Sequence, residues 1–319
     1  MKFAVIGAGG IGGYFGGRLA AGGHDVWFVA RGDNLTALRQ DGLRVQSIAG
    51  DFAVAPVQAT ADVRQIGEVD FVLLCTKTWQ VPVAVARLEP LIGASTGVVT
   101  LQNGVDTPEA VASVVGRDAV LPGAARIFSS LASPGRVCHV GGPASLAFAE
   151  WDSRPTDRAD QLAAAFSQSA VPAAASADIW AELWAKFLFV VPVGGVGAAT
   201  GAPIGVLRSR AGTRELIFAG MREIRDIAVA LGIKLPDDAI GAAMNFTDGL
   251  PAAATSSLQR DIAAGQPSEL ESWTGAVVRL GARSGTPTPV SSVLYELLSL
   301  REAQSGAGDG PGQAPGTAG

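Results

Sequence analysis

The sequence has few of the residues on which metal sites and many hydrolases depend. Among its 319 residues are only two cysteines, Cys75 and Cys138, and two histidines, His24 and His139. Two isolated cysteines form neither a disulfide framework nor a zinc pattern, which is typical of a protein in a reducing cytosol. So few histidines also argue against a histidine-based metal site or a Ser-His-Asp triad. We therefore expect a cytoplasmic protein without a metal site.

Charged residues are also scarce, at 17% against 48% apolar residues, so the chain is globular rather than disordered. The net charge of −5 and the lack of a Lys/Arg-rich run argue against a nucleic-acid partner. Residues 187–207 carry no charge and are long enough to cross a bilayer. However, two prolines and five glycines in this stretch suit a broken, buried helix pair better than a lipid-facing helix. No membrane partner is expected.

Strands and helices alternate in the first part of the chain, which predicts a parallel, doubly wound sheet of the Rossmann type. Short apolar runs predict buried strands at 3–7, 25–30, 69–75 and 97–101. Helices are expected at 10–21, 33–40 and 80–91, with a fourth beginning at Thr107-Pro108-Glu109. Residues 43–48 and 52–55 predict a hairpin, and the sheet is expected to end in antiparallel strands at 120–128, 136–140 and 145–149.

After about residue 176 the apolar periodicity becomes helical, which predicts an all-helical second domain. The expected helices lie at 177–191, 203–209, 212–231, 236–248, 255–264, 269–284 and 290–302. Residues 304–319 consist mostly of Gly, Pro and Ala, so they cannot bury a core and should be disordered. The predicted organisation is therefore an α/β domain at 1–175, a helical domain at 176–303 and a tail at 304–319.

The first strand runs into a glycine-rich loop, GAGGIG at residues 7–12, that fits the pattern G-x-G-x-x-G. Between a strand and a helix this pattern predicts a dinucleotide site. Gly7 allows the tight turn, Gly9 lets the backbone approach a pyrophosphate, and Gly12 lets the helix pack on the strand. The candidate cofactor-binding residues are Gly7, Gly9, Gly10, Ile11 and Gly12. The alternative is an ordinary turn in a chain with 41 glycines.

The end of the second strand indicates which dinucleotide is bound. NAD-binding enzymes usually place Asp or Glu there for the ribose hydroxyls, whereas this sequence, VWFVARGDN, places Arg31 there and has no acid before Asp33. A guanidinium pairs with a 2′-phosphate that a carboxylate would repel, so Arg31 favours NADP(H). The alternative is that Arg31 is solvated and Asp33 only caps the next helix.

A lysine lies in the most apolar part of the sequence, ELWAKFLFVVPVGG at 182–195. In a structural interpretation, Lys186 pairs with Glu182 four residues earlier, which contributes about 0.2–0.5 kcal/mol, and its ammonium reaches water along apolar surface. In a catalytic interpretation, Lys186 is the proton donor that a reductase with so few histidines needs. Ser268 and Glu271 match a capping box, which leaves Glu269 free to be the carboxylate partner of the lysine.

The chain resembles the ketopantoate reductase (2-dehydropantoate 2-reductase) family from Met1 to about Glu302. The resemblance rests on six motifs in order: GAGGIGGYFGGRLA at 7–20, CTKTWQ at 75–80, LQNGVD at 101–106, LWAKF at 183–187, TSSLQRD at 255–261 and SELE at 268–271. It implies an NADPH-dependent reduction of a 2-keto acid to a 2-hydroxy acid, as in pantothenate biosynthesis. The substrate is then expected between the carboxyl edge of the sheet and the helical domain. A homodimer is one alternative for the oligomeric state.

The resemblance also implies roles for single residues. Lys186 matches the general acid of the family, and Glu269 the acid that contacts the substrate. Asn103 matches a residue at the nicotinamide and substrate side of the cleft, Lys77 a lysine on the cofactor side, and Ser257 a serine that binds substrate. Two alternatives remain open, because Asn103-Gly104 is also a turn dipeptide and Ser257 could be an ordinary helix-start hydroxyl.

The match fails at two positions. Pantoate-making members carry Asn four and eight residues after the lysine, where this chain has Val190 and Gly194. Losing two polar contacts weakens selectivity for a hydroxylated substrate, and the pair Gly194-Gly195 is expected to leave room beside the lysine. A bulkier or more apolar 2-keto acid is therefore a hypothesis. The alternatives are a related dehydrogenase of the β-hydroxy acid or opine type, and a non-catalytic NADPH sensor.

Overall fold

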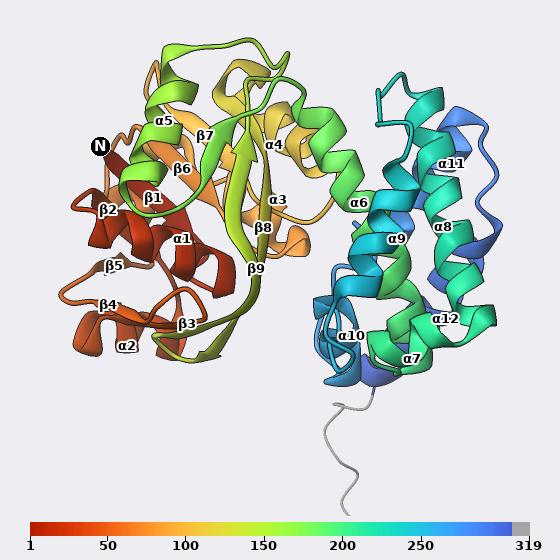
Figure 1. Cartoon of the computed structure of the whole chain (residues 1–319). Helices are drawn as coiled ribbons and strands as arrows, with labels where there is room; N and C mark the ends of the chain where they lie inside the picture. The colour runs from red at the N-terminus through yellow and green to blue at the C-terminus, as the bar shows by residue number, and fades with distance from the viewer. Residues whose placement is uncertain (308–319) are drawn as a thin grey trace, which may run out of the picture. The chain divides into compact units, whose positions relative to one another are not determined.

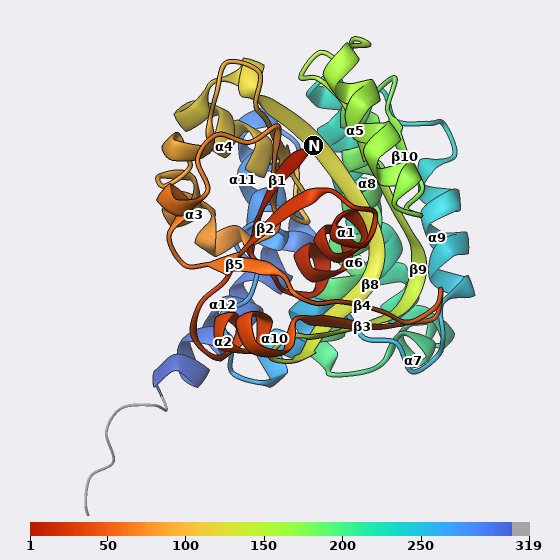
Figure 2. The ribbon, with the colours of Figure 1, turned by 90° about the vertical axis from the view of Figure 1, so that its left-hand side faces the viewer.

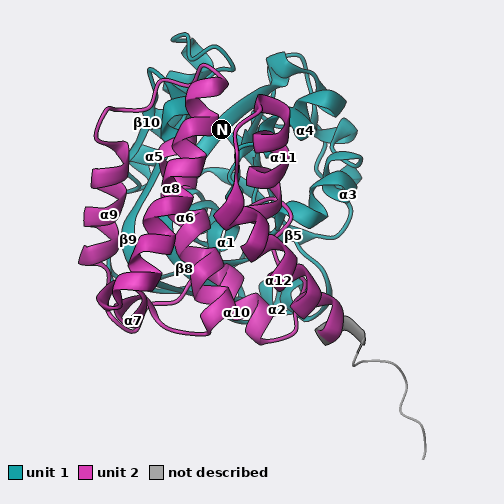
Figure 3. Cartoon of the chain, turned by 90° about the vertical axis from the view of Figure 1, so that its right-hand side faces the viewer, with its two compact units in different colours: residues 1–183 teal, residues 184–319 magenta. Residues whose placement is uncertain are grey.

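A computed structural model of the chain describes residues 1–307 and divides into two compact units, Met1–Leu183 and Trp184–Gly319 (Figure 3). The division falls inside helix α6 (Ile179–Thr200), a few residues after the boundary predicted near 175. The prediction of a disordered tail is wrong at residues 304–307, which belong to helix α12 (Pro289–Ala307). Its remainder, 308–319, lies outside the described residues.

Unit 1 contains one mixed sheet, as Figure 1 shows. Six strands are parallel neighbours, in the order β5 (Gln58–Thr60), β2 (Asp25–Val29), β1 (Lys2–Ile6), β6 (Phe71–Leu74), β7 (Gly97–Thr100) and β8 (Val120–Ser133). Beyond β8 the sheet continues with β9 (Arg136–Phe148), β3 (Leu43–Ser47) and β4 (Phe52–Val54), and β10 (Ala173–Ala175) lies beside β9. The β8–β9 and β3–β4 pairs are antiparallel. The predictions of a parallel sheet, a hairpin and an antiparallel end are therefore confirmed.

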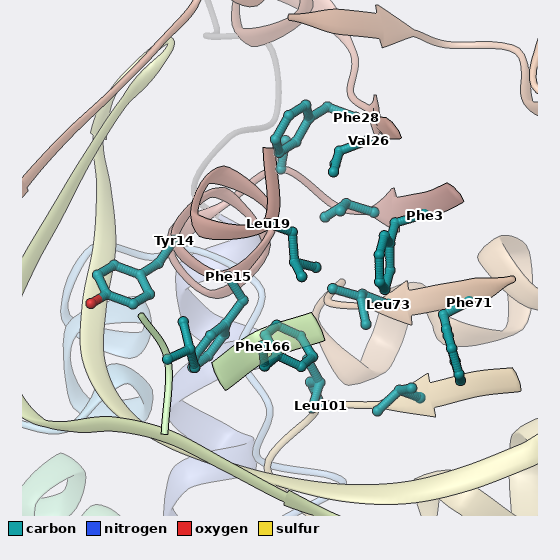
Figure 4. Packing of buried hydrophobic residues seen from close by; sticks show 14 of the residues in the cluster. Phe3, Tyr14, Phe15, Leu19, Val26, Phe28, Phe71, Leu73, Leu101 and Phe166 are labelled. Carbon is teal, nitrogen blue, oxygen red and sulfur yellow. The ribbon is translucent and has the colours of Figure 1, made fainter. Parts of the chain in front are cut away.

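Helices cover both faces of this sheet (Figure 2). On one face α1 (Gly10–Ala21) and α5 (Asp157–Gln168) bury their apolar residues against the strands, and Figure 4 shows Phe15 and Leu19 of α1 near Phe3 and Phe166. On the other face the apolar residues come from α3 (Val81–Val85) and α4 (Thr107–Val115). Alternating strand residues point to opposite faces, so β1 serves both cores with Phe3 and Ala4.

Three differences from the predicted elements of unit 1 have local causes. The three strands expected at 120–149 are two long strands of one hairpin, β8 and β9. The helix expected at 80–91 ends at Val85 and is followed by a separate 3₁₀ turn, Glu89–Leu91, whose Pro90 cannot donate a backbone hydrogen bond. Helix α5 was not predicted, although its signal is present: Thr156 Oγ1 accepts a hydrogen bond from the Ala159 N–H, 3.3 Å away.

The regular elements among the described residues of unit 2 are all helices, as predicted. After α6 it contains α7 (Ile204–Ser209), α8 (Ala211–Ala230), α9 (Ala239–Gly249), α10 (Ser257–Ala263), α11 (Thr274–Ser284) and α12. Helix α6 continues past the predicted end at residue 191, through Pro192, to Thr200. It is long and apolar enough to cross a membrane, but 67% of its apolar window is buried in the structure, as in the core helix of a folded domain.

A buried carboxylate anchors the segment between β9 and α5. Glu150 is only 4% exposed and accepts hydrogen bonds from Thr156 Oγ1 at 2.6 Å and from the Arg158 guanidinium at 2.5 and 2.7 Å. Burial alone raises the pKa of Glu150, but the hydrogen bonds from Arg158 and Thr156 outweigh it, so the pKa lies below its ordinary value. The ionised form is therefore stabilised in the folded protein.

We expect Glu150 to make the folded state sensitive to acid. Because its folded pKa is depressed, its stabilisation is present above the unfolded pKa of about 4.3 and is lost as the pH falls through the folded pKa. Glu150→Gln should therefore lower the free energy of unfolding at pH 7, with the difference from the unchanged protein shrinking below about pH 4. Urea unfolding at several pH values measures this. Glu109→Gln, which removes the exposed pair with Arg117, is the control with a small expected effect, and equal effects of both changes would contradict the assignment.

Candidate functional site

The predicted cofactor residues of unit 1 gather at one edge of the sheet. Ile6, the last residue of β1, pairs with Val29 and Leu74, the last residues of β2 and β6. The end of β6 pairs in turn with the end of β7. The candidate residues follow these strand ends: the loop 7–12 after β1, Arg31 after β2, Lys77 after β6 and Asn103 after β7. Dinucleotides bind at such carboxyl edges of parallel strands.

Two glycines of the loop have conformational or packing reasons to be glycine. Gly7 has a φ of +98°, which side chains rarely adopt. A Cβ at Gly12 would lie 2.1 Å from the carbonyl oxygen of Gly7 and 2.8 Å from Cγ1 of Val5, so helix α1 packs on β1 only because this position lacks a side chain. Together they set a tight turn and a close helix–strand contact.

The rest of the loop fits a phosphate group. A Cβ built at Gly9 meets no atom within 4 Å, so the loop leaves open space there. No side chain of the described residues caps α1, which leaves the N–H groups of its first turn, from Gly10 to Gly12, available to an anion. Gly10 lies against β8, where a Cβ would approach Ser129 to 2.8 Å, so β8 closes one side of the loop. The half-buried Ile11 packs on the core.

Arg31 lies at the N-terminal end of α2 (Gly32–Asp41) with an exposed side chain. The expectation that Asp33 caps this helix is wrong, because the capping position is Arg31 and no described side chain makes the cap hydrogen bond. Asp33 lies instead in the first turn, where a carboxylate favours the helix dipole. An exposed guanidinium next to the phosphate loop can pair with an anionic group bound there.

Lys77 and Asn103 are half-buried in the loops that follow β6 and β7. The buried Gln102 joins these loops, because its Nε2 donates to the carbonyl oxygens of Leu74 at 2.9 Å and Thr76 at 3.1 Å. Sequence reasoning missed this residue, although it lies within the motif LQNGVD. Its amide fixes the positions from which Lys77 and Asn103 project.

Glu182, the proposed structural partner of Lys186, also forms an ion pair with a strand of the sheet. The Glu182 carboxylate accepts a hydrogen bond from the guanidinium of Arg126 on β8. Lys186 itself is half-buried on α6, with Phe187 and Leu188 buried beside it. Glu182 thus links the first turn of α6 to β8.

The capping box expected at Ser268 and Glu271 is wrong. Helix α11 begins only at Thr274, and Ser268 Oγ accepts a hydrogen bond from the Leu270 N–H instead. Glu271 is exposed, and its carboxylate accepts hydrogen bonds from the Tyr295 hydroxyl, at 2.6 Å, and from Arg279. Glu269, in contrast, is only 5% exposed, so of the two glutamates in this turn it is the buried one.

Gly194 is the point on α6 where two other segments of unit 2 meet. A Cβ there would lie 2.7 Å from Cζ3 of Trp273 and 3.6 Å from Ser256 Oγ. The backbone N–H of Trp273 donates to the backbone carbonyl oxygen of Glu269 at 3.0 Å. The turn that carries Glu269 therefore packs on α6, the helix that carries Lys186. The structure thus brings together around one helix the three segments that carry Lys186, Glu269 and the start of α10.

The start of α10 is capped by Ser256, whose Oγ accepts a hydrogen bond from the Gln259 N–H at 3.0 Å. Ser257 is the first residue of the helix and is half-buried. Ser257 thus lies at the helix start, as the structural alternative expected, although the capping hydroxyl is that of its neighbour Ser256.

The expected room at Gly194-Gly195 is also absent. The Trp273 ring occupies the space at Gly194, and a Cβ at Gly195 would lie 3.3 Å from Cδ1 of Leu294. Both glycines are buried, so they permit close packing of unit 2 and do not enlarge a pocket. At Gly194, where pantoate-making members carry their second Asn, the Trp273 ring therefore fills the space.

We predict that Gly194→Ala lowers the free energy of unfolding by about 1–3 kcal/mol, because the added methyl overlaps the Trp273 ring. Gly212→Ala in α8 is the matched control, since a Cβ there meets no atom within 4 Å. That change should raise stability by about 0.5–1 kcal/mol. Urea unfolding of both variants gives the comparison, and changes of the same sign would show that Gly194 is not tightly packed.

The comparisons with known proteins cover both units. The profile described as "Ketopantoate reductase PanE/ApbA" matches residues 3–153, and its C-terminal counterpart matches residues 178–302. The PanE/ApbA family ketopantoate reductase of Ralstonia eutropha JMP134 is 32% identical, with a TM-score of 0.89 over 96% of this chain and 100% of that one. The 2-dehydropantoate 2-reductase of Mesorhizobium japonicum is 29% identical over 96% of this chain and 99% of its own.

A D-mandelate dehydrogenase solved with NADH shares the fold at 22% identity, with a TM-score of 0.87 over 96% of this chain and 99% of that chain. Both units thus align with proteins of one family over nearly the whole chain. The chain therefore belongs to the ketopantoate reductase family, whose members are NADP-dependent oxidoreductases that interconvert a ketone and an alcohol.

Proposed function

We propose that this protein reduces a 2-keto acid to the 2-hydroxy acid with NADPH, with Lys186 as the general acid. The observation that carries the proposal is the packing around α6. The half-buried Lys186 projects from this helix, and the segments with Ser257 and the buried Glu269 pack on the same helix. These three segments come from distant parts of the chain, so the packing of unit 2 gathers the residues that the proposed reaction needs.

The proposed chemistry is a coupled transfer of hydride and proton. When bound, NADPH supplies the hydride that the carbonyl carbon accepts. The Lys186 ammonium donates a proton to the carbonyl oxygen, so that the C=O double bond becomes a C–H and an O–H bond and the amine is left neutral. Before transfer, the ammonium also stabilises negative charge that develops on that oxygen. Glu269 supplies the compensating charge, and Ser257 and Asn103 hydrogen-bond the substrate.

The roles in unit 1 follow from the chemistry of the sheet edge. The loop from Gly7 to Gly12 would hold the pyrophosphate on backbone N–H groups, and Arg31 would pair with the 2′-phosphate. Lys77 and Asn103 would hold the nicotinamide side. We assign 1–183 to cofactor binding and the described part of unit 2 to substrate and proton transfer. We expect the enzyme in the cytoplasm, because two isolated cysteines are typical of a protein in a reducing compartment.

The substrate is the second question. The half-buried Val190 is one turn from Lys186, where pantoate-making relatives have Asn, and Gly194 is closed by Trp273. Neither position offers a side-chain hydrogen bond to a substrate hydroxyl. These residues favour a 2-keto acid with an apolar side chain over the hydroxylated ketopantoate, and only activity on ketopantoate would connect the protein with pantothenate biosynthesis.

The test is NADPH oxidation by the full-length protein, followed by absorbance, with ketopantoate, 2-ketoisovalerate and phenylpyruvate as substrates. A higher kcat/KM for an apolar keto acid than for ketopantoate supports the substrate proposal, and a clear preference for ketopantoate overturns it. Stoichiometric NADPH binding without turnover of any keto acid would instead favour a non-catalytic NADPH sensor. NADP⁺ reduction by a β-hydroxy acid, or NADPH oxidation that requires an amino acid together with a keto acid, would favour the related dehydrogenases.

A further inference from the structure

A single amide side chain in unit 1 joins three segments at the cofactor edge. Asn34 lies in the first turn of α2, three residues after Arg31. Its Nδ2 donates to the carbonyl oxygen of Ala8 in the glycine-rich loop at 3.0 Å. Its Oδ1 accepts from the N–H of Gly135, in the turn between β8 and β9, at 2.8 Å. The carbonyl needs a donor and the N–H needs an acceptor, so the two partners fix the amide orientation.

The bond to Ala8 has a consequence for the phosphate loop. In a planar trans peptide the C=O and the following N–H point in opposite directions. Holding the Ala8 carbonyl towards α2 therefore turns the Gly9 N–H away from α2. Gly9 is also the loop position where a Cβ would meet no atom within 4 Å, so this N–H belongs to the part of the loop with open space.

We propose that Asn34 is a positioning residue for dinucleotide binding: it orients the Ala8–Gly9 peptide towards the pyrophosphate that NADPH and NADH share. This inference rests on the proposed NADPH binding. Only a side chain with both a donor and an acceptor serves both partners, and the sequence pattern G-x-G-x-x-G contains no sign of it, because Asn34 acts from 26 residues beyond Ala8 and 101 residues before Gly135.

The hydrogen bond to Gly135 connects Asn34 with the end of β8, the strand that lies against the glycine-rich loop. Gly135 has a φ of +69°, and its carbonyl oxygen accepts from the Arg44 N–H at 2.9 Å, so the turn is fixed on β3 as well. The same strand β8 lies against Gly10 at Ser129. Asn34 thus fixes the loop and one end of β8 to the same helix.

The test separates the two hydrogen bonds. Asn34→Asp keeps the acceptor for Gly135 but replaces the donor to Ala8 with a second oxygen, and Asn34→Ala removes both. We expect Asn34→Asp to raise the Kd of NADPH and of NADH by about tenfold each, because the pyrophosphate is common to both cofactors. Isothermal titration measures both constants. At saturating NADPH, kcat should stay within about twofold of the unchanged protein.

Two controls make the outcome decisive. Gln40→Glu adds the same charge at an exposed position of α2, and it should leave both Kd values unchanged. Thermal unfolding without cofactor reports any purely structural role. Asn34→Asp and Asn34→Ala with unchanged Kd values would overturn the inference, whatever their melting temperatures, and so would an effect on NADPH alone. If the unchanged protein bound neither cofactor, the proposed function itself would fail.

Discussion

Lys186→Ala is expected to lower kcat for keto acid reduction by about 10²–10⁴-fold, because a positioned general acid contributes about that much. The residue lies on α6 in unit 2, whereas the glycine-rich loop and Arg31 belong to unit 1. The Kd of NADPH should therefore change little. Steady-state kinetics with the preferred keto acid and titration of NADPH give the two quantities.

Two further variants show which property of Lys186 matters. Lys186→Arg keeps the positive charge but holds its proton at all working pH values, so it should retain substrate affinity and lose most of the turnover. Lys234→Ala removes an exposed lysine of the same unit and should leave kcat unchanged. Full activity of Lys186→Ala would return the lysine to a structural role, and full activity of Lys186→Arg would show that charge alone suffices.

Most of the fold could be predicted from local sequence patterns. The strand ends at Ile6, Val29 and Leu74 could be predicted to within one residue, because buried parallel strands are short apolar runs bounded by turn residues. Since parallel strands place their carboxyl ends at one edge, the positions of the glycine loop, Arg31 and Lys77 followed from those runs. The helical second unit followed in the same way from its periodicity.

Pairings between distant residues could not be predicted in this way. The local pattern around Glu182 gave no sign that its carboxylate binds Arg126, 56 residues earlier. The glycine at position 194 suggested open space. Trp273, from a turn much later in the chain, fills that space, and a single sequence does not reveal this contact. A capping box at Ser268 satisfied every local rule, but the chain makes a tighter turn there and begins its helix later.

These failures lie around the proposed active residues for a physical reason. A site needs side chains from segments far apart in sequence, and the contacts that hold them are as long-range as the site itself. Glu269 is an example. The local pattern indicated only that another residue capped the helix, whereas the burial of the Glu269 carboxylate became visible only in the structure. The functional roles of these residues stay predictions until they are measured.

Arg31→Ala is expected to raise the Kd of NADPH by about 10–100-fold, because a charge-assisted guanidinium–phosphate contact contributes about 1.5–3 kcal/mol. The Kd of NADH, which lacks the 2′-phosphate, should change by no more than about twofold. Arg31 is exposed at the end of β2 and has no described capping role, so its loss should leave the melting temperature of the free protein nearly unchanged.

Three comparisons decide whether Arg31 recognises the 2′-phosphate. Arg87→Ala removes another exposed arginine of unit 1, on the segment between α3 and β7, and should affect neither cofactor. The NADPH effect of Arg31→Ala should shrink at high ionic strength, since salt screens an exposed ion pair. Equal losses of NADPH and NADH affinity would rule out the contact and place Arg31 with the pyrophosphate. Substitutions at Asn34 and Arg31, three residues apart, are thus expected to differ. Changing Asn34 should weaken the binding of NADPH and NADH equally, whereas changing Arg31 should weaken only that of NADPH.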